Sequence, residues 1–178
     1  DYEKAMEWYL KASEQNYARA QLYIVMLYAY GNGVPRDLDK AIYWYKKAAV
    51  NGNTSAQMVI ANIDAEKKYE LGMMYSNGLG GEKDDKEAFF WFSQAAQQGN
   101  VDAQLRLGMI YILGRGIPKD DKKAFEWINK AAEKNNADAQ YFLGSMYQSG
   151  EGVAKDKRKA LEWLNKSAQQ GNKKAIEE

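Results

Sequence analysis

The residue types that most often do chemistry in proteins are scarce in this chain. It contains no histidine and no cysteine, so the commonest general base, the usual zinc ligands and the thiol nucleophile are all missing. The remaining acid and base candidates are carboxylates, of which Asp37, Asp84, Asp120 and Asp156 recur at related positions. Each precedes a new apolar period, where an aspartate accepts the free amide hydrogens of a helix start. We therefore predict no catalytic residue, no metal site and no cofactor.

Two other motifs suggest ligand chemistry but favour a structural explanation. Glycine pairs such as Gly114 and Gly116 resemble phosphate-binding loops, yet they follow a helix rather than a strand and lack the Lys-Ser/Thr of a P-loop. The segment Asn53-Thr54-Ser55 fits the N-glycosylation pattern, and Asn53 is also a natural N-cap. We expect the glycines to end helices and Asn53 to cap one, with glycosylation as the alternative.

Charge and hydropathy exclude several classes of partner. The 25 Lys and Arg residues are balanced by 24 Asp and Glu residues, so no strong field attracts nucleic acid or an anionic membrane. The longest apolar run, Leu22 to Tyr30, is far shorter than the roughly 20 residues that cross a bilayer. We predict no nucleic-acid binding and no membrane span. The compartment stays open between bacterial periplasmic or secreted and cytoplasmic, since a chain without cysteine suits either redox state.

Five tryptophans reveal an internal repeat. Three of the four intervals between them are 36 residues long: Trp8 to Trp44, Trp91 to Trp127 and Trp127 to Trp163. A fixed period of this size is typical of a chain that stacks copies of one supersecondary unit. Function is then expected on the surface of the stack.

Each repeat unit has two helical halves, here named helix A and helix B. In helix A of one copy, Ala103, Leu107, Ile110 and Tyr111 fall on one face at i, i+4, i+7 and i+8. A glycine beside this face predicts close approach by a neighbouring helix, and it recurs as Gly72, Gly108 and Gly144. Helix A ends at glycine pairs, which are Gly31 and Gly33, Gly78 and Gly80, Gly114 and Gly116, and Gly150 and Gly152. Helix B follows the aspartate and carries the tryptophan with a small pair behind it, an arrangement typical of interlocked helices.

The full repeat pattern resembles a known family. It reads A-x-x-x-L-G-x-x-Y-x-x-G-x-G-V/I-x-x-D-x-x-K-A-x-x-W-x-x-K-A-A from Ala103 to Ala132, and again from Ala139 to Ala168 with Ser167 in the penultimate place. This is similar to the Sel-one-like repeat (SLR), a relative of the tetratricopeptide repeat with a longer loop between its helices. The resemblance covers essentially the whole chain. It implies an all-α fold, a right-handed α-solenoid of antiparallel helix pairs with about 4.5 repeats.

We expect a single repeat domain over residues 1–178. It would comprise helix B of a truncated repeat, four repeats, and the start of a further repeat or a C-terminal cap, at 1–15, then 18–50, 54–98, 101–134 and 137–170, then 171–178. The interval from Trp44 to Trp91 is 47 residues, 11 more than the others. Because 11 residues make about three helical turns, we predict one extended helix from about Thr54 to Asn77. Loss of 25 residues from two full repeats would give the same fused helix, and omission of a flexible region from the sequence is the alternative.

The resemblance implies a protein-interaction scaffold without catalysis, as in adaptors of bacterial envelope and host-contact settings and of eukaryotic quality control. In related tetratricopeptide arrays helix A lines the inner concave surface, so the same groove is implied here. Counting 100° per residue, the residues opposite the core stripe are Arg19, Met26, Tyr30, Met73, Asn77, Asp102, Met109, Leu113, Asp138, Ser145 and Ser149. Met26, Met73 and Met109 share one position, a ladder of adaptable contacts suited to a peptide. The alternative is that these side chains pack against the next helix A.

Two further functions stay open. Cysteine-rich relatives imply an envelope enzyme or a β-lactam-binding protein, although this chain lacks their cysteines. A structural, self-associating array is the other, with Tyr23, Val25 and Tyr30 as its contacts, because the first helix A is apolar on every side. The expected partner is a protein or peptide of unknown identity, in a bacterial setting.

Overall fold

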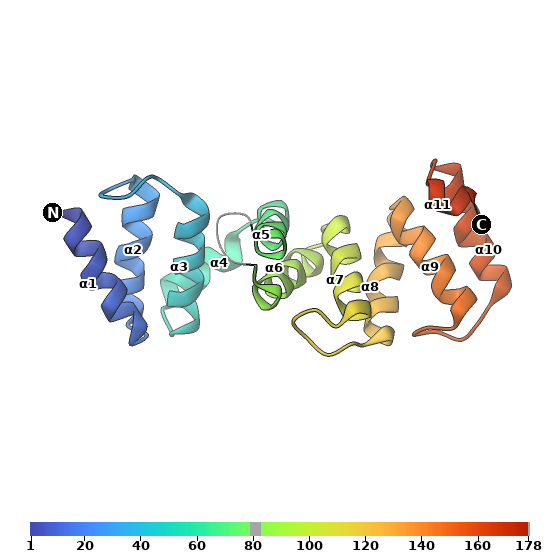
Figure 1. Ribbon diagram of the computed structural model, residues 1–178, viewed down its shortest axis with the longest axis horizontal. Coiled ribbons are helices and arrows are strands. Elements are labelled where there is room, and N and C mark those ends of the chain that lie inside the picture. Colours follow the sequence, from blue (N-terminus) through green and yellow to red (C-terminus); the bar gives the residue numbers. More distant parts are fainter. Residues whose placement is uncertain (79–82, 178) are drawn as a thin grey trace. The chain divides into compact units, whose positions relative to one another are not determined.

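The computed structural model describes residues 1–78 and 83–177, and every regular element within them is a helix. The chain divides into two compact units, Asp1–Ile63 and Asp64–Glu178. The first unit holds α1 (Tyr2–Glu14), α2 (Ala18–Tyr30), α3 (Leu38–Val50) and α4 (Thr54–Asn62). The second holds α5 (Ala65–Asn77), α6 (Asp85–Gln97), α7 (Val101–Leu113), α8 (Asp121–Glu133), α9 (Ala137–Ser149), α10 (Lys157–Gln169) and α11 (Lys173–Ile176), coloured from green to red in Figure 1.

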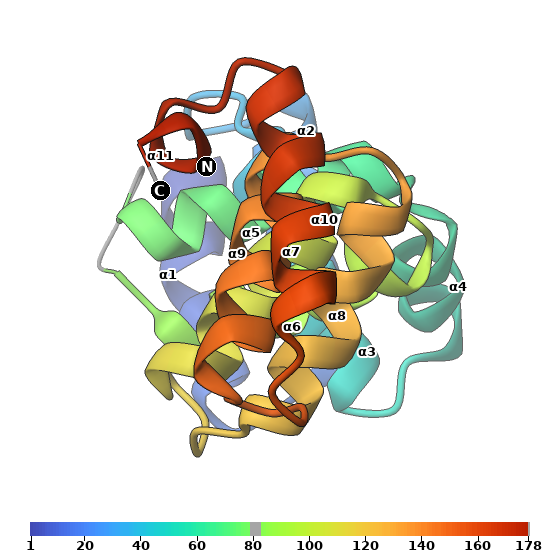
Figure 2. The same cartoon turned by 90° about the vertical axis from the view of Figure 1, so that its right-hand side faces the viewer.

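Consecutive helices pack as antiparallel pairs, which confirms the predicted helical hairpin. Helix A and helix B of one repeat are α2 and α3 in the first unit, and α5 and α6, α7 and α8, and α9 and α10 in the second. Figure 2 views the second unit from its C-terminal end, with α10 in front. None of the described helices is long and apolar enough to cross a membrane.

The helix ends form where local sequence predicts them. Gly31, Gly78, Gly114 and Gly150 all adopt the left-handed conformation just after helix A, which places their amides on its last carbonyls. Asp37, Asp84, Asp120 and Asp156 all cap helix B, as expected. The backbone amide of each capping aspartate also donates to the carbonyl of the recurring tyrosine, as from Asp120 to Tyr111 at 3.0 Å. Asn53 caps α4 through the amide of Ala56 at 2.9 Å. Gly80 lies outside the described residues.

The glycine within helix A is where helix B comes closest. A Cβ on Gly72 would lie 2.6 Å from the ring of Phe92, and one on Gly144 would lie 2.7 Å from Leu164. On Gly108 it would overlap Ile128. Only a residue without a side chain lets the backbones approach this closely, so the predicted close approach is confirmed.

The single long helix predicted over Thr54 to Asn77 is wrong. The helix breaks at Ile63, whose backbone is extended (φ −62°, ψ 130°), and Asp64 starts a new helix by accepting the amide of Lys67 at 2.8 Å. Both α4 and α5 begin as helix A does, each behind its own capping side chain. The 11 extra residues are therefore a short helix A without a helix B, not three added turns.

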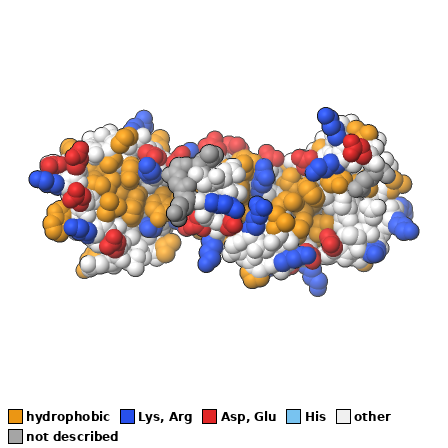
Figure 3. All heavy atoms as spheres, in the orientation of Figure 1, with side chains coloured by type: hydrophobic (Ala, Val, Ile, Leu, Met, Phe, Trp, Pro, Cys, Tyr) orange, Lys and Arg blue, Asp and Glu red, His pale blue; other side chains and the backbone are white. Residues whose placement is uncertain are grey.

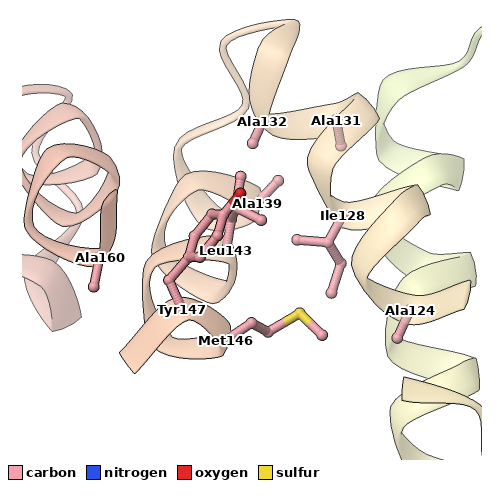
Figure 4. Close-up of a cluster of buried hydrophobic side chains, with 9 residues drawn as sticks. All are labelled: Ala124, Ile128, Ala131, Ala132, Ala139, Leu143, Met146, Tyr147 and Ala160. Atoms are coloured by element: carbon pink, nitrogen blue, oxygen red, sulfur yellow. The ribbon is translucent and has the colours of Figure 1, made fainter. Parts of the chain in front are cut away.

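The buried core follows the predicted stripe, but the tryptophans differ in how exposed they are. In the cluster of α8, α9 and α10, Ile128 points toward Leu143 and Met146 (Figure 4). Trp91 is fully buried, but Trp8 is 67% exposed, and Trp44, Trp127 and Trp163 are half-buried. The small residues behind the tryptophans, rather than the indoles, fill the centre of most repeats. Trp44, Trp127 and Trp163 pack against the edges of the core clusters, and Trp91 alone among the five is fully buried.

Candidate functional site

In the first unit, the predicted binding residues lie on one exposed stripe of α2. Arg19, Met26 and Tyr30 are all exposed, and Tyr23 lies between them at helical spacing. Tyr23 stacks on Tyr9 of α1, with ring centres 4.9 Å apart. The stripe follows from sequence, because positions 19, 23, 26 and 30 share one helix face while Ile24 and Leu27 turn into the core. Figure 3 shows hydrophobic side chains gathered over α2 and α3 on the face drawn.

Val25, named with Tyr23 and Tyr30 as a self-association contact, does not belong to this surface. Its side chain is 2% exposed, whereas Tyr23 and Tyr30 are 41% and 71% exposed. Val25 occupies the helix A position that the second unit fills with Gly72, Gly108 and Gly144, which is the side that faces helix B. Only the two tyrosines of this set are available to another molecule.

In the second unit, the structure gives several predicted binding residues a packing role. Met73 and Met109 are half-buried, and Met73 packs against the core cluster of α6 and α7. The hydroxyl of Ser145 donates to the carbonyl of Tyr141 in its own helix at 3.1 Å, and that of Ser149 reaches the carbonyl of Met146 at 3.5 Å.

Asp102 and Asp138 are exposed but engaged. They accept hydrogen bonds from Asn136 at 3.1 Å and from Asn172 at 2.8 Å, the residues that cap the next helix A. Asn77 and Leu113 remain as exposed side chains on this face. In the second-unit set, Met73 therefore packs against a core cluster and Asp102 and Asp138 bond to the next repeat. The helix A face there stays a prediction as a binding surface.

A buried glutamine in helix A is a polar feature that the sequence patterns did not single out. Gln104 and Gln140 donate through Nε2 to Ala96 at 3.1 Å and to Ala132 at 3.3 Å, the carbonyls eight residues earlier. Gln21 reaches the carbonyl of Ser13 in the same way at 3.5 Å. These carbonyls lie at the end of the preceding helix B, where each also accepts a backbone amide from the turn that follows, as Ala96 does from Gly99 at 3.1 Å. The sequence did contain a signal for this feature, because a glutamine directly follows the first alanine of the helix A core stripe in three repeats.

Lys68 takes the glutamine position in α5, and its side chain is 1% exposed. Burial lowers the pKa of Lys68, and the carboxylate of Asp64 partly opposes this. The pKa of the capping carboxyl of Asp120 is lowered mainly by the hydrogen bond that it accepts from the backbone amide of Lys123. Within the described residues, no three or more Asp and Glu side chains are grouped to hold a metal ion.

The second unit also contains an open pocket between three helices. Its volume is about 410 Å³, and its walls include Ala96 at the end of α6, Gln104 of α7, and Trp127, Lys130 and Lys134 from α8 and its C-cap. The ammonium of Lys130 lies 4.1 Å from the centre of the Trp127 ring. This pocket contains none of the residues predicted from the helix A face.

The comparisons with known proteins agree on one family. Five segments match the Sel1 repeat model, namely residues 1–17, 18–53, 68–100, 101–136 and 137–172. The segment 54–67, which contains α4, lies outside these matches. No curated protein gives a match.

Solved structures of bacterial relatives are also similar. A Sel1 repeat protein from Oxalobacter formigenes is 34% identical over 99% of this chain and 66% of its own, with a TM-score of 0.58. The protective antigen c5321 of uropathogenic Escherichia coli is 32% identical over 98% of this chain and 43% of its own, with a TM-score of 0.59. Helicobacter pylori cysteine rich protein B is 25% identical over 70% of this chain and 96% of its own, with a TM-score of 0.55.

The chain spans less than two thirds of the length of the first two relatives. The five repeat matches nevertheless show that the chain belongs to the Sel1 repeat family.

Proposed function

We propose that this chain is a non-catalytic protein-interaction scaffold that holds a segment of another protein on the exposed stripe of α2. Proteins built from Sel1 repeats act as protein-interaction scaffolds. The observation that carries the proposal for this chain is the exposure of Tyr23, Met26 and Tyr30, at 41%, 50% and 71%, along one helix face.

The chemistry of this stripe fits a peptide or helix with apolar anchors. From Arg19 to Tyr30 it runs over three turns, roughly 16 Å at 1.5 Å per residue. Tyrosine offers a large contact area at low entropic cost, and methionine adapts its shape to irregular apolar groups. Arg19 adds a cation at one end, which favours a segment with a carboxylate near one terminus.

The test begins with a random peptide library displayed on phage and selected on the immobilised protein. Enriched peptides are synthesised with a fluorophore, and their affinity is measured by anisotropy. The double variant Met26→Glu, Tyr30→Glu should weaken binding at least about tenfold, because it places charges in an apolar contact. Val50→Glu is the matched control, since Val50 is 75% exposed at the end of α3 in the same unit.

Equal affinity for the double variant and the control would remove the α2 stripe as the binding surface. Circular dichroism of each variant verifies that helical content is unchanged. Sedimentation across a range of concentrations separates the self-association alternative, which predicts a mass that falls to the monomer value in the double variant.

A further inference from the structure

The side-chain amide of the buried helix A glutamine also has an oxygen atom, Oε1, that accepts a hydrogen bond in two of the repeats. Gln140 Oε1 accepts from Gln170 Nε2 at 2.7 Å, and Gln21 Oε1 accepts from Asn51 Nδ2 at 3.0 Å. In both copies the donor is a primary carboxamide, 30 residues after the glutamine, on the residue that caps the end of helix B. The repeat thus builds a site for a carboxamide and fills it from its own chain.

One repeat builds the same site and leaves it unfilled. Residue 134 is the equivalent position for Gln104, but it is a lysine, and its Nζ donates to the carbonyl of Gly99 at 3.0 Å. Gln104 is 4% exposed, and within the described part of the chain its Oε1 is buried without a hydrogen-bond partner. A buried acceptor in this state is destabilising, so any donor that reaches it gains affinity.

Gln104 lines the 410 Å³ pocket between α6, α7 and α8, although its Oε1 atom is itself covered. A water occupies roughly 30 Å³ of liquid, so the pocket has room for a side chain. Lys134 is exposed on a flexible stem, and its movement away from Gly99 opens a path to Oε1.

The charges around this pocket favour one kind of donor. Lys130, Lys134 and Glu133 all line it, so two ammonium groups face one carboxylate, and that carboxylate already accepts a hydrogen bond from Asn129 at 2.8 Å. Two ammonium groups repel a cationic donor such as guanidinium, but they donate well to a carbonyl oxygen. Trp127 and Ala96 supply apolar surface for the carbon atoms next to that carbonyl.

We propose that this pocket binds the side-chain carboxamide of an asparagine or glutamine in a partner polypeptide. Its NH₂ group donates to Gln104 Oε1, and its carbonyl oxygen accepts from Lys134 or Lys130. The bound group thereby takes the place that Gln170 and Asn51 take in the other repeats. This proposal rests on the protein-binding role proposed above, but it uses a different surface from the α2 stripe.

The experiment is an NMR titration of the ¹⁵N-labelled full chain with propionamide, a minimal primary carboxamide. The side-chain NH₂ signal of Gln104 and the indole N–H signal of Trp127 should shift and saturate. Gln140 and Trp163, in the repeat that fills its own site, serve as controls within the same molecule and should stay in place. N,N-dimethylpropionamide has a similar apolar shape but no N–H donor, so it should cause no saturable shift.

Two exchanges between repeats make the test specific. Lys134→Gln supplies the internal donor found at Gln170 and should weaken propionamide binding at least about tenfold, because the acceptor is then occupied. Gln170→Lys empties the filled site and should create a second response at Gln140 and Trp163. Both residues are exposed, and a dispersed amide spectrum verifies the fold of each variant.

Three results would overturn the carboxamide site. These are the absence of a saturable shift at Gln104, equal responses to propionamide and its dimethylated form, and unchanged binding in Lys134→Gln. A fourth is a nuclear Overhauser contact between the Lys134 side chain and the Gln104 side-chain NH₂ group in the free protein, which would show that the chain satisfies the acceptor by itself. Because Met26→Glu, Tyr30→Glu should leave this titration unchanged, failure of the α2 proposal and failure of this one are distinguishable.

Discussion

Asp102 accepts a hydrogen bond from Nδ2 of Asn136 at 3.1 Å, although the two residues are 34 positions apart. The Oδ1 atom of the same asparagine accepts the amide of Ala139 at 2.9 Å and so caps α9. Asn136 thus fixes the start of its own helix and ties it to the helix A before it. The pairs of Glu66 with Asn100 at 3.0 Å and Asp138 with Asn172 at 2.8 Å repeat the arrangement.

This pair predicts a specific pattern of double-mutant energies. Asn136→Asp keeps the cap, since Asp and Asn cap helices about equally, but it replaces the donor with a carboxylate facing Asp102. We expect the free energy of unfolding to fall by about 1 kcal/mol. Adding Asp102→Asn restores a donor with the roles reversed and should recover most of this loss. Urea unfolding of the two single variants and the double variant at pH 7 measures the coupling, and purely additive losses would contradict it.

The contact between α7 and α8 at Gly108 predicts a loss of stability on adding one methyl group. Alanine favours a helix over glycine by about 1 kcal/mol, so Gly108→Ala would stabilise an unpacked helix. Here the added Cβ overlaps Ile128, and overpacking of this kind costs about 1–3 kcal/mol. We expect a net loss, reduced when Ile128→Val makes room. Thermal and urea unfolding test this against Arg106→Ala, an exposed control on the same helix, and a gain of stability would refute the close contact.

Lys68 predicts a pH dependence of stability at alkaline pH. Because burial lowers its pKa in the folded chain below the ordinary value of 10.5, the unfolded chain holds this proton more tightly. The contribution of Lys68 therefore destabilises the fold at neutral pH, and the penalty fades as pH rises through the lowered pKa toward 10.5.

The matching variant is Lys68→Gln, which introduces the residue found at Gln104 and Gln140. It should raise the free energy of unfolding at pH 7 and flatten its rise between pH 7 and the ordinary lysine pKa. The measurement is the difference in urea midpoint between variant and parent at each pH in this range. Because both proteins contain the same tyrosines, the effect of tyrosine titration cancels in this difference. Lys122→Gln, at an exposed lysine, should change neither quantity. A slope that persists in Lys68→Gln would assign it to other groups.

Local sequence was sufficient to predict where most helices begin and end. Gly114 ends α7 and Asp120 caps α8 because their own backbone and side-chain preferences act over only a few residues. The same reasoning failed between α4 and α5. The apolar stripe from Ala56 through Ile60 to Leu71 continues across the break, because 11 residues correspond to nearly whole helical turns. The capping side chain of Asp64 was the signal that periodicity concealed.

The candidate site shows the same division. The helix A face followed from angular position, but the exposure of each side chain on it did not. Met26 is half exposed while Met73 packs against a core cluster, and the two residues occupy equivalent positions in their repeats. The neighbour that covers or uncovers such a residue lies on another helix, so the residue's own position cannot reveal it.

The sequence by itself determined the repeat, its helix pairs, their caps and the glycines that admit close packing, because each depends on contacts within a few residues or on a fixed period. Only the tertiary structure decided which of the recurring polar side chains find a hydrogen-bond partner. Gln104 and Gln140 are the same residue at the same position. The Oε1 of Gln140 has a carboxamide donor, whereas that of Gln104 has no donor among the described residues. The difference arises 30 residues away, at Gln170 and Lys134, and it exists only once the end of helix B has packed against the start of helix A.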